Sequence, residues 1–219
     1  HLLINILFDG QNCGSPRCFS RRFIMNPEIQ KRQICNSLKI ITEIFGSCNA
    51  DYRILGSVLL VAHTNRVFRR INDVDILLDI NAKECVFEKL KSYGFQFEKK
   101  AKAGFSWVEA KKDKYLGLTF FLVGEFNKDY FSWRFMRFFE LRIRAGYLSP
   151  TEYNFEGSKF IGIPISSAIA GIRQSFLNPK RKLDKQIIED EVGKTKVKIY
   201  DNISIYIFRT KLPYLYDSF

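Results

Sequence analysis

Two aspartates separated by one residue, Asp73 and Asp75, have the spacing in this chain that most directly suggests chemistry. They open a run that continues as Ile76-Leu77-Leu78, and this composition predicts a strand. Side chains two positions apart on a strand point to the same side, with Cα atoms roughly 6.6 Å apart. Both carboxylates can therefore bind one hard cation such as Mg²⁺, which takes carboxylate oxygens together with substrate phosphates.

A glycine and a serine, Gly56 and Ser57, precede the aspartates at the end of a short apolar run, 52–55. The order predicts a strand, a turn, a helix over 58–63 and the aspartate strand. Glycine lets the backbone approach a ligand closely, and the first amides of the helix can hold phosphate oxygens. Alone, such a junction is also ordinary turn chemistry, and paired acids are often only solvated. Together they favour a site for a metal-bound nucleoside triphosphate.

The elements that position these residues follow from the hydrophobic pattern. Asn26, Pro27 and Gly46 delimit a helix over 27–45, and a second helix is predicted over 82–93. Runs 105–110 and 116–123 form a hairpin that extends the sheet beside the aspartates. Later segments predict a hairpin over 155–164, a helix over 166–176 and a terminal hairpin over 196–208.

The stretch from Gly56 to Asp75 resembles the nucleotidyltransferase superfamily, with its minimal DNA polymerase β-like fold. It is similar to the small bacterial aminoglycoside and lincosamide nucleotidyltransferases. The resemblance implies an α+β fold, in which helices pack on a mixed sheet and a smaller C-terminal part contains helix and hairpin. It also implies that Gly56 and Ser57 contact the triphosphate and that Asp73 and Asp75 hold Mg²⁺. Relatives often carry arginine just before the aspartates, and of Arg66, Arg69 and Arg70 we select Arg70; a solvated basic turn is the alternative.

One departure from the family concerns the third carboxylate, which these enzymes place on a later strand. Thr119 stands at the corresponding position, and a neutral hydroxyl is a poor base near pH 7. Glu109 on the partner strand is the substitute that we select as the third catalytic acid, ahead of Glu125. Glu109 could equally be an outward-facing residue paired with a lysine. By resemblance, Lys182 and Asp184 line the cleft or form a solvated turn.

The predicted organisation has three parts. Residues 1–24 mix glycine, serine, proline and arginine without a period, and we expect an N-terminal extension or a mis-assigned start. Residues 25–128 form the nucleotidyltransferase core, and 129–219 complete the cleft. Aromatic and basic residues alternate over 129–144, which suits either nucleic-acid stacking or a core with one solvated face.

Composition restricts the class of protein. The chain has 219 residues, 46% of them hydrophobic and 26% charged, as in soluble globular proteins. No apolar run approaches the roughly 20 residues of a membrane span. The formal charge of +12 favours anionic ligands such as nucleotides. Five cysteines without zinc-binding spacing suggest reduced thiols and a cytoplasmic location, with a Cys13–Cys18 pair as a minor alternative.

The sequence thus predicts an Mg²⁺-dependent nucleotidyltransferase that moves a nucleoside monophosphate from an NTP, expected to be ATP, to a hydroxyl of a small molecule, RNA or protein. One alternative is a catalytically impaired protein of the same fold that binds nucleic acid or acts as a toxin–antitoxin partner. Another is a phosphocholine-transferring relative, although Arg69-Arg70-Ile71-Asn72 replaces the Pro-Trp-Asp element usual there. Neither the acceptor nor the oligomeric state follows from the sequence.

Overall fold

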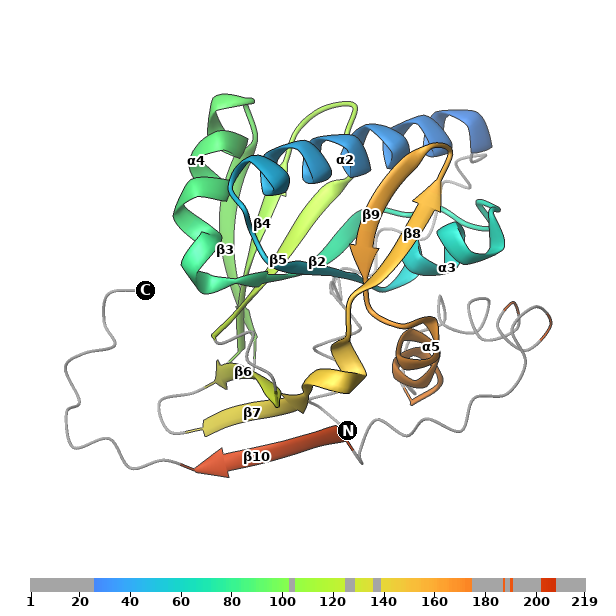
Figure 1. Cartoon of the computed structure of the whole chain (residues 1–219). Helices are drawn as coiled ribbons and strands as arrows, with labels where there is room; N and C mark the ends of the chain where they lie inside the picture. Colours follow the sequence, from blue (N-terminus) through green and yellow to red (C-terminus); the bar gives the residue numbers. More distant parts are fainter. Residues whose placement is uncertain are drawn as a thin grey trace.

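A computed structural model describes residues 26–102, 105–124, 129–135, 139–174, 187, 190 and 202–207. Within these ranges the chain forms a mixed sheet of seven strands, in the order β3-β4-β5-β2-β1-β9-β8, and an antiparallel sheet of three, β10-β7-β6. Helices pack on the larger sheet (Figure 1), so the predicted α+β class with helices on a mixed sheet is confirmed. The helices are α2 (Pro27–Ser47), α3 (Ser57–Thr64), α4 (Lys83–Ser92) and α5 (Ile165–Gln174). The strands are β1 (Tyr52–Leu55), β2 (Asp73–Asp79), β3 (Gln96–Lys102), β4 (Phe105–Lys111), β5 (Gly117–Val123), β6 (Tyr130–Phe135), β7 (Phe139–Arg144), β8 (Thr151–Phe155), β9 (Ser158–Gly162) and β10 (Ile203–Ile207).

The first helix, α2, begins as its sequence predicts. The Asn26 side chain accepts hydrogen bonds from the backbone N–H groups of Glu28 and Ile29, at 3.0 and 3.3 Å, and Pro27 occupies the first turn. Its apolar residues recur at helical spacing and are buried, as for Ile34, Leu38 and Ile41. The helix therefore covers the sheet with one continuous apolar face.

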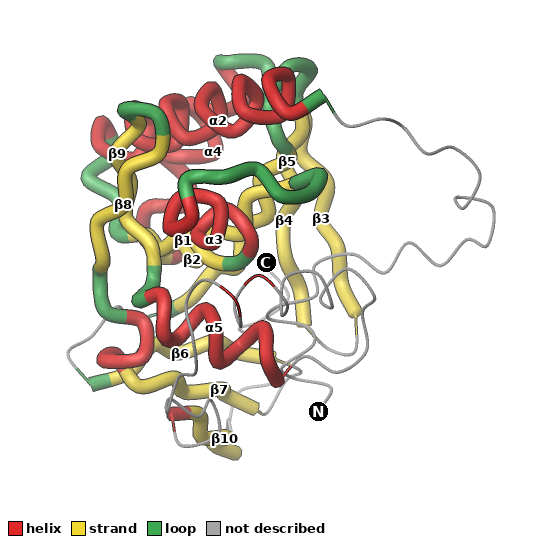
Figure 2. Tube along the Cα trace, turned by 90° about the vertical axis from the view of Figure 1, so that its right-hand side faces the viewer, coloured by secondary structure: helices red, strands yellow, loops and turns green. Residues whose placement is uncertain are grey.

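The two faces of the large sheet have different partners. Phe120 of β5 contacts Phe45 of α2 and Phe87 of α4, with ring centroids 6.3 and 5.1 Å apart. Phe121, the next residue, points to the other face and contacts Trp133 of β6 at 5.4 Å. Helices α2 and α4 thus cover one face, and the small sheet lies against the other (Figures 1 and 2).

A small contact joins the later part of the chain to the helix of the Gly-Ser turn. Leu60 of α3 and Ile169 of α5 are both buried and pack together, and α5 lies next to α3 in Figure 2. The segment after residue 129 therefore contributes to more than one part of the fold. It supplies β6 and β7 to the small sheet and β8 and β9 to the large one, where β9 pairs with β1. The predicted division at residue 128 remains a prediction.

Most of the predicted elements are present. The helices over 27–45, 58–63, 82–93 and 166–176 correspond to α2, α3, α4 and the described length of α5. The strand over 52–55, the aspartate strand and the hairpin over 105–123 correspond to β1, β2, β4 and β5. Strand β3 was not predicted. Of the terminal hairpin, the described residues include β10, which pairs with β7.

The cysteines require a correction. Cys48, at the end of α2, forms a disulfide with Cys85 of α4, so the expectation of reduced thiols is wrong for this pair. Spacing could not reveal it, because the two residues are 37 positions apart and meet only when the helices pack. Cys35 is a free thiol whose pKa is raised by burial.

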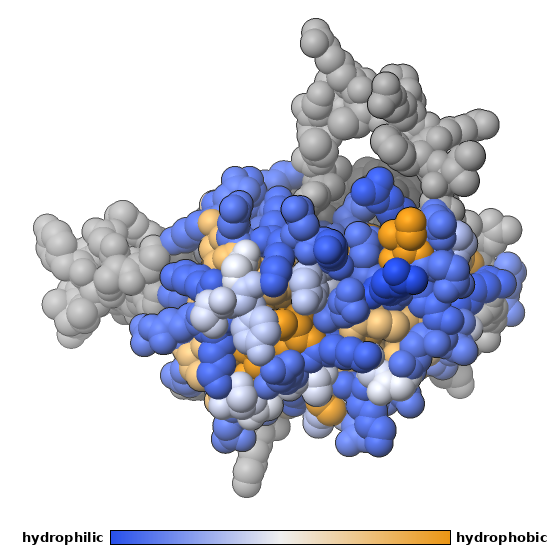
Figure 3. Space-filling model, turned by 90° about the horizontal axis from the view of Figure 1, so that it is seen from above, coloured by the Kyte–Doolittle hydropathy of each residue, from blue (hydrophilic) through white to orange (hydrophobic). Residues whose placement is uncertain are grey.

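The surface over α2 and α4 is mostly hydrophilic, with hydrophobic patches between the polar side chains (Figure 3). In the described part of the chain no helix combines the length and the apolar character needed to cross a bilayer. Several predictions fall outside the described residues: the extension over 1–24 with its Cys13–Cys18 pair, and the site candidates Glu125, Lys182 and Asp184.

Candidate active site

The glycine of the Gly-Ser turn lies directly against an aspartate. Strand β1 ends at Leu55, which pairs with Asp75 of the antiparallel strand β2. Gly56 then turns the chain into α3 with φ 72° and ψ −147°, a conformation that is essentially restricted to glycine. A Cβ atom at Gly56 would lie 2.7 Å from Oδ2 of Asp75. The turn and the carboxylate therefore adjoin the same small space.

The two aspartates share one side of β2. Val74 and Ile76 are fully buried, whereas Asp73 and Asp75 alternate with them and are partly exposed. Because Asp75 is paired in register with Thr119 of β5, and Thr119 lies between Leu118 and Phe120, the aspartates occupy the face opposite α2 and α4.

Glu109 lies in the same row across the sheet. Strand β4 pairs Glu109 with Thr119, and β5 pairs Thr119 with Asp75, so the three side chains stand on adjacent strands and point to one face. Neighbouring strands are about 4.8 Å apart, which places the Glu109 backbone two strand spacings from that of Asp75. The register thus brings the substitute acid into the row of Asp75, with Thr119 between them.

The Glu109 carboxylate is held by its own strand. The residue is only 3% exposed. Trp107 donates its indole N–H to Oε1 at 3.1 Å, and the Lys111 ammonium lies 2.8 Å from Oε2. These residues are two positions apart on β4, so all three share a face. The lysine partner named in the alternative for Glu109 is present, although Glu109 is buried and not outward-facing, and its role as the third acid remains a prediction.

The positive charge of Lys111 is stabilised by the neighbouring acids. Its pKa is raised, mainly by the hydrogen bond to Glu109; burial opposes this to a lesser extent, and the charges of Glu109, Glu98 and Asp73 raise the pKa further. The ammonium group therefore stays charged next to the acids.

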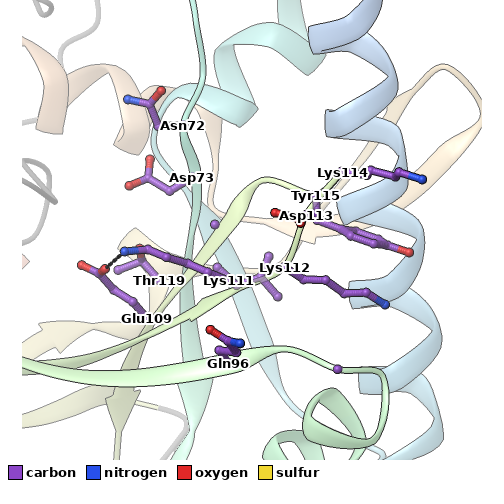
Figure 4. A pocket seen from close by; sticks show the side chains of 13 residues that line it. Asn72, Asp73, Gln96, Glu109, Lys111, Lys112, Asp113, Lys114, Tyr115 and Thr119 are labelled. Carbon is purple, nitrogen blue, oxygen red and sulfur yellow. Dashed lines mark ion pairs between the residues drawn. The ribbon is translucent and has the colours of Figure 1, made fainter.

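A pocket of about 660 Å³ opens on the β4–β5 side of the aspartates (Figure 4). Asp73, Glu109 and Thr119 line one end, and the turn between β4 and β5 lines the other. The remaining lining residues are Asn72, Gly94, Gln96, Lys111, Lys112, Asp113, Lys114, Tyr115, Gly117 and Leu118. The Gly-Ser turn lies on the β1 side of β2 and is not part of this lining. The strand order therefore separates two candidate subsites, one on each side of the aspartate strand.

An arginine that the sequence analysis did not select reaches the Gly-Ser turn. Arg69 donates a hydrogen bond from its guanidinium to Oγ of Ser57 and another to the backbone carbonyl of Arg70, the latter at 2.9 Å. The Arg70 side chain is exposed, and its role as a ligand remains a prediction. The sequence could not choose between the two, because the segment between α3 and β2 has no periodicity that fixes side-chain direction.

Among the described residues, no three His, Cys, Asp or Glu side chains form a group that could hold a metal ion. The donor set next to the turn consists of Asp73 and Asp75, which suits Mg²⁺ because that ion usually takes one or two carboxylates and completes its shell with phosphates and water. A Cβ atom at position 56 would lie 2.7 Å from Oδ2 of Asp75, so glycine is the residue that lets the backbone of the turn come this close to the carboxylate.

Solved structures of low sequence identity share this fold. The lincosamide antibiotic adenylyltransferase LnuA, solved with lincomycin bound, aligns with a TM-score of 0.59 and 18% identity over 70% of this chain and 95% of that one. ANT(2″)-Ia in complex with adenylyl-2″-tobramycin aligns with a TM-score of 0.54 and 11% identity over 73% and 89% of the two chains. No protein-family model and no curated protein sequence matches. The chain has a nucleotidyltransferase fold similar to that of the antibiotic nucleotidyltransferases.

Proposed function

We propose that this protein is an Mg²⁺-dependent nucleotidyltransferase that transfers a nucleoside monophosphate from an NTP to a hydroxyl group of a small molecule. The close approach of the Gly56 backbone to the Asp75 carboxylate carries this proposal. In such an enzyme the metal ion bridges the protein and the triphosphate. The turn whose backbone amides bind phosphate and the carboxylate that binds the metal must therefore lie next to the same ligand.

Each group at the site has a role in this proposal. The amides after Gly56 and the hydroxyl of Ser57 seat the phosphates, and Arg69 or Arg70 adds a guanidinium. Asp73 and Asp75 hold Mg²⁺, which when bound supplies positive charge to the α-phosphate and the leaving group. Glu109 is the base for the acceptor hydroxyl.

The acceptor oxygen attacks the α-phosphorus while its proton passes to the Glu109 carboxylate. The bond from the α-phosphorus to the bridging oxygen breaks, and pyrophosphate leaves with that oxygen and its electron pair. The products are the nucleotidylated acceptor and pyrophosphate, and Glu109 later returns its proton to water.

The pocket on the β4–β5 side supports a small acceptor. Its volume of about 660 Å³ lies within the range of small-molecule sites, and Glu109 stands at its end next to Asp73. LnuA is described as an adenylyltransferase and its structure holds lincomycin, while the structure of ANT(2″)-Ia holds an adenylylated tobramycin. We extend from these proteins the proposal that ATP is the donor and that a hydroxyl-bearing small molecule is the acceptor.

Nucleotide binding tests the metal site directly. We expect ATP to bind in the presence of Mg²⁺ by calorimetry, and we expect Asp73→Asn combined with Asp75→Asn to weaken this binding at least tenfold, because neutral amides are poor ligands for a hard cation. A matched control removes two charges elsewhere. Glu84→Gln combined with Glu88→Gln changes exposed acids on α4, on the opposite face of the sheet, and should leave the affinity unchanged.

Equal ATP affinity in the aspartate variant and in the wild type would contradict the proposal. Salt-sensitive RNA binding that needs neither Mg²⁺ nor the aspartates would instead favour a nucleic-acid-binding protein with the same fold.

A further inference from the structure

The ion pair between Lys111 and Glu109 bears on the number of metal ions that the site binds. This inference rests on the proposed function. In two-metal sites a second divalent ion stabilises the attacking oxygen. We propose that the Lys111 ammonium takes the place of this second ion, so that the protein works with one divalent ion at Asp73 and Asp75.

The first argument is the engagement of Glu109. Its Oε2 lies 2.8 Å from the Lys111 ammonium, and its Oε1 accepts the Trp107 indole N–H at 3.1 Å. The carboxylate of a residue that is 3% exposed requires a compensating charge, and the lysine two positions along the strand supplies it. A second metal ion at Glu109 would have to displace this ammonium.

The second argument is position. Lys111 and Asp73 both line the pocket, together with Thr119 (Figure 4). The side chain of Lys111 extends along the pocket wall to Glu109 and lies near enough to Asp73 to sense its charge. The ammonium thus lies beside the proposed base, in the pocket that Asp73 also lines, where it can supply positive charge as the acceptor oxygen becomes negative.

The third argument is the side chain that lies between Asp75 and Glu109. The residue between Asp75 and Glu109 in the row is Thr119, a neutral side chain that does not bridge two metal ions as a carboxylate does. In the reaction Lys111 keeps its proton and donates a hydrogen bond, while Glu109 receives the proton of the acceptor.

The number of bound Mn²⁺ ions tests this inference. Mn²⁺ is titrated into the protein with a non-hydrolysable ATP analogue, and bound ions are counted by electron paramagnetic resonance. We expect one ion per chain in the wild type. Lys111→Met should admit a second, weaker ion because Glu109 loses its ammonium partner, and adding Glu109→Gln should abolish that second site. Lys111→Arg, which keeps the charge, should bind one ion.

Lys114→Met is the matched control. It removes the same charge from the turn at the other end of the pocket, where the residue is exposed, and should bind one ion like the wild type. Two ions in the wild-type protein would overturn the inference without touching the proposed function, and this measurement does not depend on whether any variant folds. A second ion that fails to appear in correctly folded Lys111→Met would also overturn it. Failure of Mn²⁺ and nucleotide to bind at all would overturn the proposed function itself.

Discussion

At the scale of single residues, the conformation of Gly56 decides how closely the two sides of the proposed nucleotide site approach. Its φ of 72° is unfavourable for any residue with a Cβ atom. An oxygen of Asp75 lies only 2.7 Å from the position that this atom would take, which is too close for a Cβ contact. A methyl group here would have to move the carboxylate or the turn, and either movement separates the phosphate seat from the metal ligand.

Gly56→Ala should therefore impair both stability and nucleotide binding. We expect a loss of about 1–3 kcal/mol in the free energy of unfolding from backbone strain, and at least a tenfold weaker affinity for ATP with Mg²⁺. Urea unfolding and calorimetry measure the two effects. Gly46→Ala is the control, because a Cβ there meets nothing within 4 Å and alanine favours the helix that contains it. Wild-type affinity in Gly56→Ala would show that the turn does not seat the phosphates.

The residues of the site differ in how far local sequence can predict them. Asp73 and Asp75 are two apart on one strand, so strand alternation alone places them on one side. The position of Glu109 relative to them depends on the pairing of three strands, which no short segment encodes. A lysine partner for Glu109 was an alternative, but the sequence could not identify Lys111 as that lysine, because Lys111 belongs to a lysine-rich segment that resembles an ordinary polar turn.

At the scale of elements, buried strands were predictable and an edge strand was not. β2 and β5 are rich in Val, Ile, Leu and Phe and lie in the middle of the sheet. Among the strands that the structure describes, β3 pairs only with β4, and it reads Gln-Phe-Glu-Lys-Lys-Ala-Lys, with most side chains exposed. Such polar composition protects a sheet edge from further pairing, and it also removes the hydrophobic pattern by which a strand is recognised.

The hairpin β8–β9 gives a prediction about alkaline pH. Tyr153 of β8 donates its hydroxyl to the carbonyl of Ile163 at 2.7 Å, and burial raises its pKa to about 12. In the unfolded chain a tyrosine pKa is about 10. Since the folded pKa is higher, the stabilisation is complete below about pH 10 and is lost as the pH rises towards about 12, where the unfolded chain releases its proton first.

Tyr153→Phe should lower the free energy of unfolding at pH 8 by about 1 kcal/mol, because one hydrogen bond is gone. Between pH 8 and pH 11, the free energy of unfolding should then fall less in this variant than in the wild type. Urea midpoints at the two pH values measure both quantities. Parallel losses in the two proteins would show that this hydroxyl does not titrate with folding. Tyr147, whose hydroxyl donates to the carbonyl of Ser167 and whose pKa is likewise raised by burial, remains in both proteins.

At the scale of the whole molecule, a covalent bond links two helices that cover the same face of the large sheet. The Cys48–Cys85 disulfide joins the end of α2 to α4, and β1, α3 and β2 lie between the two cysteines in sequence. A crosslink of this span restricts the unfolded chain more than the folded one, and the chain-entropy relation gives about 4 kcal/mol for its loop.

Reduction should consequently lower the free energy of unfolding by about 4 kcal/mol. Guanidinium unfolding with and without dithiothreitol measures this difference. Cys48→Ser combined with Cys85→Ser should match the reduced wild type and should not respond to reductant, whereas Cys35→Ser, which changes a free thiol, should keep the full response. An unfolding midpoint that is insensitive to reductant in the wild type would contradict a stabilising role for the bond.

The same disulfide closes a ring around the segment that carries Gly56, Ser57, Asp73 and Asp75, since all four lie between its two cysteines. If a protease cuts the backbone once inside this ring, the two fragments stay tethered and migrate as a single species on a gel until a reductant is added. A molecule cut in this way can keep the turn and the aspartates in one folded unit. The site can therefore persist although the peptide chain between Cys48 and Cys85 is no longer intact.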